Sequence, residues 1–172
     1  MASLSYDIFE TKFGWVGVIA SEKGLRRSTL PNDSPEACAS RLGPELGRAE
    51  HRPEAVADIR QKLVAYFEGE PVSFDDESVD WEGAGEFYKA AWSACRSIPE
   101  GETRTYQWLA AQAGSPNAPR AAGQSMANNR LPVIVPCHRV IAKDGSLRGF
   151  GEGASRLDLK QQMLDLEAAT PV

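Results

Sequence analysis

The sequence contains little cysteine and histidine, and it has no long hydrophobic run. Three cysteines and two histidines are spread over 172 residues, and no two cysteines form a CxxC pair. This scarcity excludes a disulfide scaffold and a zinc ribbon, and it is typical of a reducing compartment. No apolar run approaches the roughly 20 residues of a membrane span, and the first residues lack the basic and apolar regions of a signal peptide. We therefore expect a cytoplasmic protein (nuclear in a eukaryote) that binds no membrane.

The composition indicates a globular chain whose charge is unevenly distributed. Hydrophobic residues make up 42% of the sequence and charged residues 25%, which is ordinary for a globular protein. Residues 1–86 carry 9 Lys and Arg against 17 Asp and Glu, whereas residues 87–172 carry 10 against 7. Such an asymmetry predicts two modules, with a polyanion as the partner of the second. An ordinary mixed surface is the alternative interpretation.

The first half predicts a β-meander followed by two helices. Strand-forming residues alternate with turn signals up to Leu30. Ser34 followed by Pro35 is typical of a capped helix start. After Pro53, apolar residues recur at helical spacing, and Gly69 ends this second helix.

Residues 68–86 have the composition of a linker. They include eight acidic residues and no Lys or Arg, and Gly83 and Gly85 interrupt regular structure. We expect a solvated connection here, with domains at 1–82 and 83–172.

The second half predicts mainly helices. Helical patterns cover 87–96, 105–113 and 119–128, and a last helix covers 155–168. Two helices joined by a short Gly/Pro turn between 105 and 128 match a helix-turn-helix, although many such pairs never bind DNA. In the last helix, the apolar residues expected on one face are Leu159, Met163 and Leu166.

An apolar segment over 131–141 presents one cysteine between a proline and a histidine. A buried thiol is ordinarily inert, and a reactive thiol needs a nearby base or positive charge. Here His138 and Arg139 follow Cys137 directly, and Pro136 restrains the backbone before it. From these residues alone, an ordinary buried cysteine remains an equal alternative.

The segment Pro136-Cys137-His138-Arg139-Val140 resembles the active-site signature of the O6-alkylguanine-DNA alkyltransferases. Further segments resemble successive motifs of that family in the same order: 101–106, 118–123, 128–129, 145–147 and 160–167. The resemblance covers residues 80–168 strongly. It implies an α+β fold class: an N-terminal ribonuclease-H-like β-meander with helices, then a mostly helical, winged-helix-like domain containing the helix-turn-helix.

The resemblance also implies an activity, a methylated-DNA–protein-cysteine S-methyltransferase. The alkyl group of a flipped-out O6-alkylguanine in double-stranded DNA would move irreversibly to Cys137, so each molecule would act once. No cofactor and no metal are needed, and we expect Cys38 and Cys95 to be packing residues. O4-alkylthymine is a second candidate lesion. We expect a monomer, and cooperative binding along DNA is left open.

Four further residues would take part in catalysis, by the same resemblance. His138 would accept the thiol proton through a water molecule, and Glu167 would orient the His138 ring. Asn129 would organise the active-site turn. Tyr106 would contact the flipped guanine and help to protonate it as it leaves.

The resemblance extends to the DNA-binding surface. Arg120 would fill the space left by the flipped base. Ala121 and Gly123 are small enough to let their helix approach the minor groove, where sequence readout is poor. Arg130 would contact a phosphate.

The pocket for the flipped base would be formed by Pro132, Val140, Phe150 and Gly151. Phe150 stands where the family often has a tyrosine, and Arg130 stands where many members have proline.

Three alternative functions fit these residues less well. A non-catalytic, alkyltransferase-like damage-binding protein would lack the acceptor cysteine, and Cys137 is present. A cysteine hydrolase is disfavoured because Cys137 and His138 are adjacent, and hydrolase pairs usually come from distant segments. A helix-turn-helix regulator would leave the Pro-Cys-His-Arg-Val segment unexplained.

Overall fold

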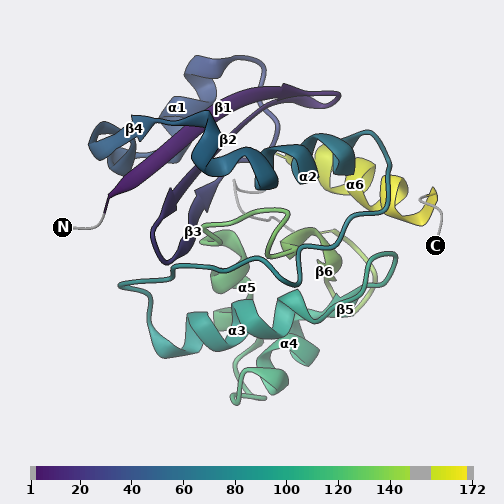
Figure 1. The fold of residues 1–172 in the computed structure, drawn as a ribbon. Coiled ribbons are helices and arrows are strands. Elements are labelled where there is room, and N and C mark those ends of the chain that lie inside the picture. Colours follow the sequence, from purple (N-terminus) through teal and green to yellow (C-terminus); the bar gives the residue numbers. More distant parts are fainter. Residues whose placement is uncertain (1–2, 148–155, 170–172) are drawn as a thin grey trace. The chain divides into compact units, whose positions relative to one another are not determined.

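The computed structural model describes residues 3–147 and 156–169, which divide into two compact units (Figure 1). Unit 1 extends to Asp80, and unit 2 comprises Trp81–Ala169. The domain ranges 1–82 and 83–172 stay a prediction. Within the described ranges, every helix is too short or too polar to cross a membrane.

Unit 1 contains a four-stranded sheet. Its strands are β1 (Leu4–Thr11), β2 (Gly14–Ser21), β3 (Gly24–Ser28) and β4 (Ala49–His51), in the order β3-β2-β1-β4. The first three form the expected antiparallel meander, whereas β4 pairs with β1 in parallel. Gly14 has a φ of 136° at the first turn, a conformation that glycine adopts without steric cost.

Helices cover this sheet. The α-helices are α1 (Pro35–Leu42) and α2 (Ala57–Phe67), and they pack on β2 and β1 respectively (Figure 1). The Ser34 side chain accepts a hydrogen bond from the Ala37 amide at 3.1 Å, which is the predicted cap. Short 3₁₀ helices precede β4 and α2: η1 (Pro44–Arg48) and η2 (Pro53–Val56). Packing of α1 against the sheet buries Leu4, Ile19 and Leu42 together.

The acidic segment is not the fully solvated connection that its composition predicts. Part of it lies along β3: the Leu25 amide donates to the Ser78 carbonyl at 2.9 Å, and the Asp80 amide donates to the Leu25 carbonyl at 2.8 Å. The Asp80 side chain is 4% exposed and binds Arg26 at 3.0 Å. The segment is ordered because it satisfies backbone groups of an edge strand, which charge counting does not reveal.

Unit 2 is mainly helical. Its helices are α3 (Glu86–Arg96), α4 (Tyr106–Gln112), α5 (Pro119–Ala127), η3 (Cys137–Arg139) and α6 (Leu157–Ala169). Helices α4 and α5 form the expected helix-turn-helix pair. Thr105 caps α4 by accepting from the Trp108 amide at 3.0 Å. Two short parallel strands, β5 (Arg104–Thr105) and β6 (Val140–Ile141), connect the start of α4 with the segment after η3.

Helix α6 buries a different set of residues from the one predicted. Leu159 and Met163 are buried as expected, but Leu166 is only half-buried. Its place is taken by two charged residues, Lys160 and Glu167, which are 0% and 4% exposed. The apolar pattern therefore identified the helix but misplaced its inner face.

Candidate active site

Asn129 closes the turn that leads to Cys137. Its Nδ2 donates to the Val135 carbonyl at 2.8 Å, and its Oδ1 accepts from the Leu131 amide at 3.0 Å. The side chain is 6% exposed, so both hydrogen bonds lie in a dry environment. The Cys137 amide donates to the same Val135 carbonyl at 2.7 Å. Asn129 thus fixes the backbone that delivers the thiol.

The turn contains a strained residue. Val133 has a φ of 77°, the left-handed conformation that β-branched side chains avoid. Such strain costs roughly 1–3 kcal/mol and persists only where surrounding contacts determine the backbone. Here the side chain is 2% exposed. A strained backbone just before Cys137 fits a segment shaped for the position of that thiol.

Cys137, His138 and Glu167 are brought together by η3 and α6. Cys137 is 1% exposed and His138 is 0% exposed. His138 Nε2 forms a short hydrogen bond with Glu167 Oε2. Because a carboxylate accepts, Nε2 carries the ring proton, and the buried Nδ1 carries the lone pair of a neutral ring. A histidine in this tautomer can accept a proton at Nδ1.

Arg139 holds the same carboxylate. Its Nε donates to Glu167 Oε1 at 2.8 Å, and one terminal nitrogen donates to Oε2 at 3.1 Å. The other terminal nitrogen donates to the Ile98 carbonyl at 2.7 Å. Both oxygens of Glu167 are therefore occupied.

Burial and these contacts set the charges of the pair. Burial lowers the pKa of His138 below its ordinary value, although the Glu167 hydrogen bond opposes this. Burial alone would raise the pKa of the Glu167 carboxyl, but hydrogen bonds from His138 and Arg139 outweigh it and hold that pKa well below the usual range. The site thus pairs a neutral histidine with a charged carboxylate.

Lys160 is a site residue for which the sequence predicts no individual role. Its Nζ donates to the Val140 carbonyl at 2.8 Å and lies 5.9 Å from the centroid of the Tyr106 ring. Burial lowers its pKa to about 8. The available signal was its spacing: Lys160, Met163 and Glu167 fall on one face of α6.

The remaining two cysteines are also buried. Cys38 in unit 1 lies 3.0 Å from the Trp15 carbonyl. Burial raises the pKa of Cys95 well above its ordinary value, and the nearby Cys137 adds to the effect. A thiol in that state is a poor nucleophile. Among the described residues, no cluster of three or more His, Cys, Asp or Glu is placed to hold a metal ion.

A groove of about 770 Å³ lies on the helix-turn-helix side of the site. Arg120 is exposed on the first turn of α5, and Tyr106 begins α4. A methyl group added at Gly123 would lie 3.9 Å from the Tyr106 ring. Ala121 is half-buried on α5 and does not line the groove. The groove is lined by Tyr106, Gln107, Pro119, Arg120, Gly123, Ala142 and Lys143.

Arg130 lies outside that lining. Its guanidinium donates to the Glu82 carbonyl at 2.9 Å and stacks 5.7 Å above the centroid of the Trp92 ring. These contacts anchor Arg130 within unit 2, and its predicted phosphate contact would have to use its remaining donors.

The predicted base pocket is described in part. Pro132 and Val140 are buried, and the Val140 carbonyl accepts from Lys160. Phe150 and Gly151 lie outside the described residues.

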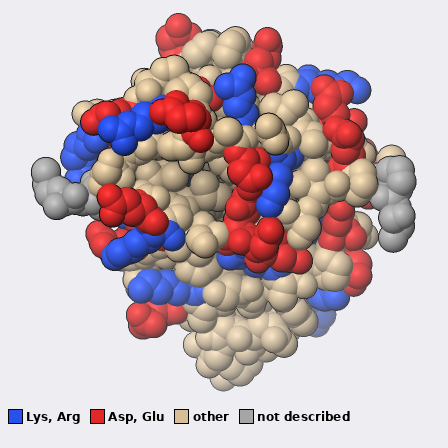
Figure 2. Space-filling model, viewed as in Figure 1, with Lys and Arg blue, Asp and Glu red and all other residues tan. Residues whose placement is uncertain are grey.

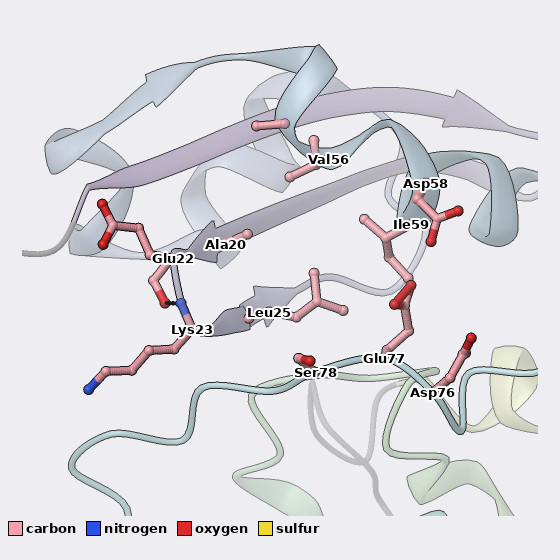
Figure 3. A pocket seen from close by; sticks show the side chains of 13 residues that line it. Ala20, Glu22, Lys23, Leu25, Val56, Asp58, Ile59, Asp76, Glu77 and Ser78 are labelled. Atoms are coloured by element: carbon pink, nitrogen blue, oxygen red, sulfur yellow. Dashed lines mark hydrogen bonds between the residues drawn. The ribbon is translucent and has the colours of Figure 1, made fainter.

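A second hollow, of about 300 Å³, lies in unit 1. Figure 3 shows the apolar side chains of Leu25, Val56 and Ile59 around it, with Asp76 and Glu77 on the side of Ile59. Acidic side chains also gather in the middle of the face shown in Figure 2, with basic side chains between them. A carboxylate-rimmed hollow disfavours a phosphate ligand. It also has no thiol or histidine in its lining, so the candidate site is the one in unit 2.

Comparison with known proteins matches both units. Residues 4–81 match the model described as 6-O-methylguanine DNA methyltransferase, ribonuclease-like domain. Residues 86–169 match 6-O-methylguanine DNA methyltransferase, DNA binding domain. The methylated-DNA–protein-cysteine methyltransferase of Methanosarcina acetivorans is 39% identical over 166 residues, which is 95% of this chain and 98% of the relative. That of Mycolicibacterium paratuberculosis is 46% identical over 115 residues, 67% of each chain.

Solved structures show the same relationship. The Mycobacterium tuberculosis OGT in complex with DNA has a TM-score of 0.80 and 30% identity, covering 96% of this chain and 94% of that one. A variant of the M. tuberculosis O6-methylguanine methyltransferase has a TM-score of 0.79 and 31% identity, covering 100% and 96%.

A sheet-containing unit followed by a helix-turn-helix unit with a histidine-flanked, buried thiol defines a class of two-unit DNA-binding proteins. Within that class, this chain belongs to the 6-O-methylguanine DNA methyltransferase family. The fold class and the family expected from the sequence are thereby confirmed.

Proposed function

We propose that this protein repairs alkylated DNA by moving the alkyl group from O6 of guanine to the Sγ of Cys137, once per molecule. One chain of contacts carries the proposal. Tyr106 lines the groove, its ring lies 5.9 Å from Lys160 Nζ, and Lys160 binds the carbonyl of Val140, three residues after Cys137. The groove is therefore connected to the thiol segment through Tyr106 and Lys160. The names of the relatives and the similarity to a DNA complex support duplex DNA as partner.

His138 and Glu167 activate the thiol. The proton of Cys137 moves through a water molecule to His138 Nδ1, while Nε2 keeps its hydrogen bond to Glu167. The ring becomes an imidazolium, and the Glu167 carboxylate stabilises this charge. The Cys137 thiolate that remains is far more nucleophilic than the thiol.

The transfer is a direct displacement at the alkyl carbon. The Cys137 thiolate forms a C–S bond as the bond from carbon to O6 breaks, and that electron pair stays with the guanine. Tyr106 donates its hydroxyl proton to the departing base, which would otherwise leave as an anion. The thioether that forms is stable and is not removed, so the protein acts once.

The helix-turn-helix presents the damaged base. Flipping a base out of the stack costs on the order of a few kcal/mol. Arg120 is exposed on α5 and fills the space that the base leaves. Lys143 lines the same groove and contacts a phosphate. Small residues on α5, Ala121 and Gly123, let the helix approach the minor groove.

The flipped base is held next to the thiol segment. The carbonyls of Cys137 and Val140 accept from the guanine amino group, and Pro132 and Val140 contribute apolar walls. The Val140 carbonyl already binds Lys160 and uses its second lone pair for this. O6-alkylguanine is the main lesion in this proposal, and a monomer is the acting form.

Counting lesions against protein molecules tests the proposal. Duplex DNA carrying one O6-methylguanine is incubated with increasing amounts of protein, and the remaining lesion is measured. We expect one lesion to disappear per protein molecule. Cys137→Ser should remove none while still binding the damaged duplex. Lesion removal by Cys137→Ser would contradict the assignment of the acceptor. Tight binding by the wild type with no removal would instead indicate a non-catalytic damage-binding protein.

A further inference from the structure

We propose that Arg139 is a positioning residue for alkyl transfer: it fixes the Glu167 carboxylate that holds His138, and its charge keeps His138 neutral until the thiol proton arrives. This inference rests on the proposed function, because it assigns a role within the same site. Arg139 binds Glu167 and the Ile98 carbonyl, so we infer that it acts through Glu167.

The contacts of Arg139 hold the Glu167 carboxylate in one position and one orientation. Its guanidinium donates to both oxygens of Glu167 on α6 and to the Ile98 carbonyl after α3. Arg139 itself belongs to η3, so one planar group connects three separate segments. Its side chain is only 11% exposed and that of Glu167 is 1% exposed. Two parallel N–H groups on one carboxylate fix its plane as well as its position, which a lysine cannot do.

The plane of Glu167 sets the orientation of His138. Glu167 Oε2 accepts from His138 Nε2 and from Arg139, and Oε1 accepts from Arg139. If the carboxylate rotated, the ring would turn with it, and Nδ1 would no longer face the proton that it receives. Misplacement of a general base by about 1 Å can lower a rate roughly 100-fold.

The positive charge of Arg139 also affects the protonation state of His138. A buried, unneutralised Glu167 would favour a protonated His138, and a protonated ring cannot accept the thiol proton. Arg139 and Lys160 oppose this by lowering the pKa of His138. Among the residues that the structure describes, further titratable groups near the cluster are Cys137 on η3, Cys95 on α3 and Glu100 in the segment after α3. Arg139 contacts Glu167 directly from η3, as His138 does, and it brings a fixed positive charge to the carboxylate.

The alternative is that Arg139 merely fastens three segments together. If the role of Arg139 is only structural, replacing it should affect folding and lower the transfer rate by the same factor at every pH. The proposed role makes a different prediction, because the neutral fraction of His138 limits the reaction at low pH. Raising the pKa of His138 moves the acid limb of the pH–rate profile to higher pH.

The experiment measures alkyl transfer to the full chain from free O6-benzylguanine, which requires no DNA binding, across about pH 5 to 9. Wild type, Arg139→Gln and Arg139→Lys are compared. Arg104→Gln is the matched control, since Arg104 forms a more exposed ion pair with Glu102 in the same unit. Thermal unfolding of each variant is recorded in parallel.

For Arg139→Gln we expect the acid limb to move up by about one pH unit, a roughly tenfold loss of rate on that limb. Arg139→Lys should return the acid limb toward the wild-type position, because lysine restores the positive charge. The full rate should not return, because lysine cannot donate two parallel hydrogen bonds to the carboxylate. Arg104→Gln should match the wild type.

An equal loss at every pH, or no difference between Arg139→Gln and Arg139→Lys, would overturn the proposal. If Arg139→Gln does not fold, the double variant Arg139→Gln/Glu167→Gln removes the unneutralised charge. The acid limb of this double variant should lie at or below the wild-type position. An acid limb above it would overturn the proposal. Failure of the proposed function is distinct, because then the wild type itself transfers no alkyl group to Cys137.

Discussion

The Asn129 amide nitrogen donates to the carbonyl oxygen of Val135 at 2.8 Å, and the backbone amide of Cys137 donates to that same oxygen. One carbonyl thus joins the Asn129 turn to the candidate nucleophile. The strained φ of Val133 lies inside the loop that this contact closes.

Replacing Asn129 with alanine should therefore loosen the turn. Two buried hydrogen bonds are lost, one from the Leu131 amide and one to the Val135 carbonyl, which should lower the free energy of unfolding by about 2–4 kcal/mol. Urea unfolding measures this directly. Alkyl transfer should fall further than binding to damaged duplex, because the turn positions the thiol. Asn117→Ala, in an exposed turn of the same unit, is the control. Equal losses of transfer and binding would contradict a specific role for the turn.

Replacing Lys160 with methionine should change how stability depends on pH. Burial lowers the pKa of Lys160 to about 8 from an ordinary value of 10.5. Between these pH values the unfolded chain binds more protons than the folded chain, so the stability of the wild type rises with pH. The rise amounts to roughly 3 kcal/mol and should be missing in Lys160→Met. Urea unfolding of both proteins at about pH 7.5 and 10 tests this. Parallel changes in the two proteins would show that Lys160 is not the group responsible.

Arg120 should matter for duplex DNA and not for a free base. Arg120→Ala removes the side chain that fills the vacated position, so transfer from a duplex lesion should fall by about 10- to 100-fold. The rate with free O6-benzylguanine should stay unchanged. Single-turnover kinetics with both substrates measure the two effects. If both rates fall by the same factor, Arg120 does not act on the DNA.

Arg130 and Lys143 should differ in their effect on salt dependence. Lys143 lines the groove, and Lys143→Ala should reduce the slope of log affinity against log salt by about one. Arg130 is anchored by Glu82 and Trp92. We therefore expect Arg130→Ala to leave the slope unchanged and to cost about 1 kcal/mol of stability. A reduced slope for Arg130→Ala would contradict this expectation and would support the phosphate contact predicted from the sequence.

Features encoded in a few adjacent residues could be predicted from the sequence. Ser34 and Thr105 cap their helices as expected, since capping depends on one side chain and an amide three residues away. The meander and the helix-turn-helix pair follow from periodicity and turn residues.

Features that depend on distant residues could not be predicted. Strands β4, β5 and β6 have only two or three residues each, too few to show a period, and they form by pairing with remote segments. The inner face of α6 was misassigned because Lys160 and Glu167 are buried against the usual preference of charged residues. Burial of Lys160 is possible because its ammonium group donates to the Val140 carbonyl. Burial of Glu167 is possible because Arg139 and His138 donate to its carboxylate. The role of Arg139 likewise becomes visible only when η3, α6 and the end of α3 are placed together.

The central claim is that Cys137 receives the alkyl group, and intact-protein mass spectrometry tests it most directly. The protein is incubated with duplex DNA carrying one O6-methylguanine and is then digested for peptide mapping. We expect each protein molecule to gain the mass of one methylene group, located on Cys137. An unchanged protein mass with the lesion still in the DNA, or a methyl group located on Cys95 or Cys38, would contradict it.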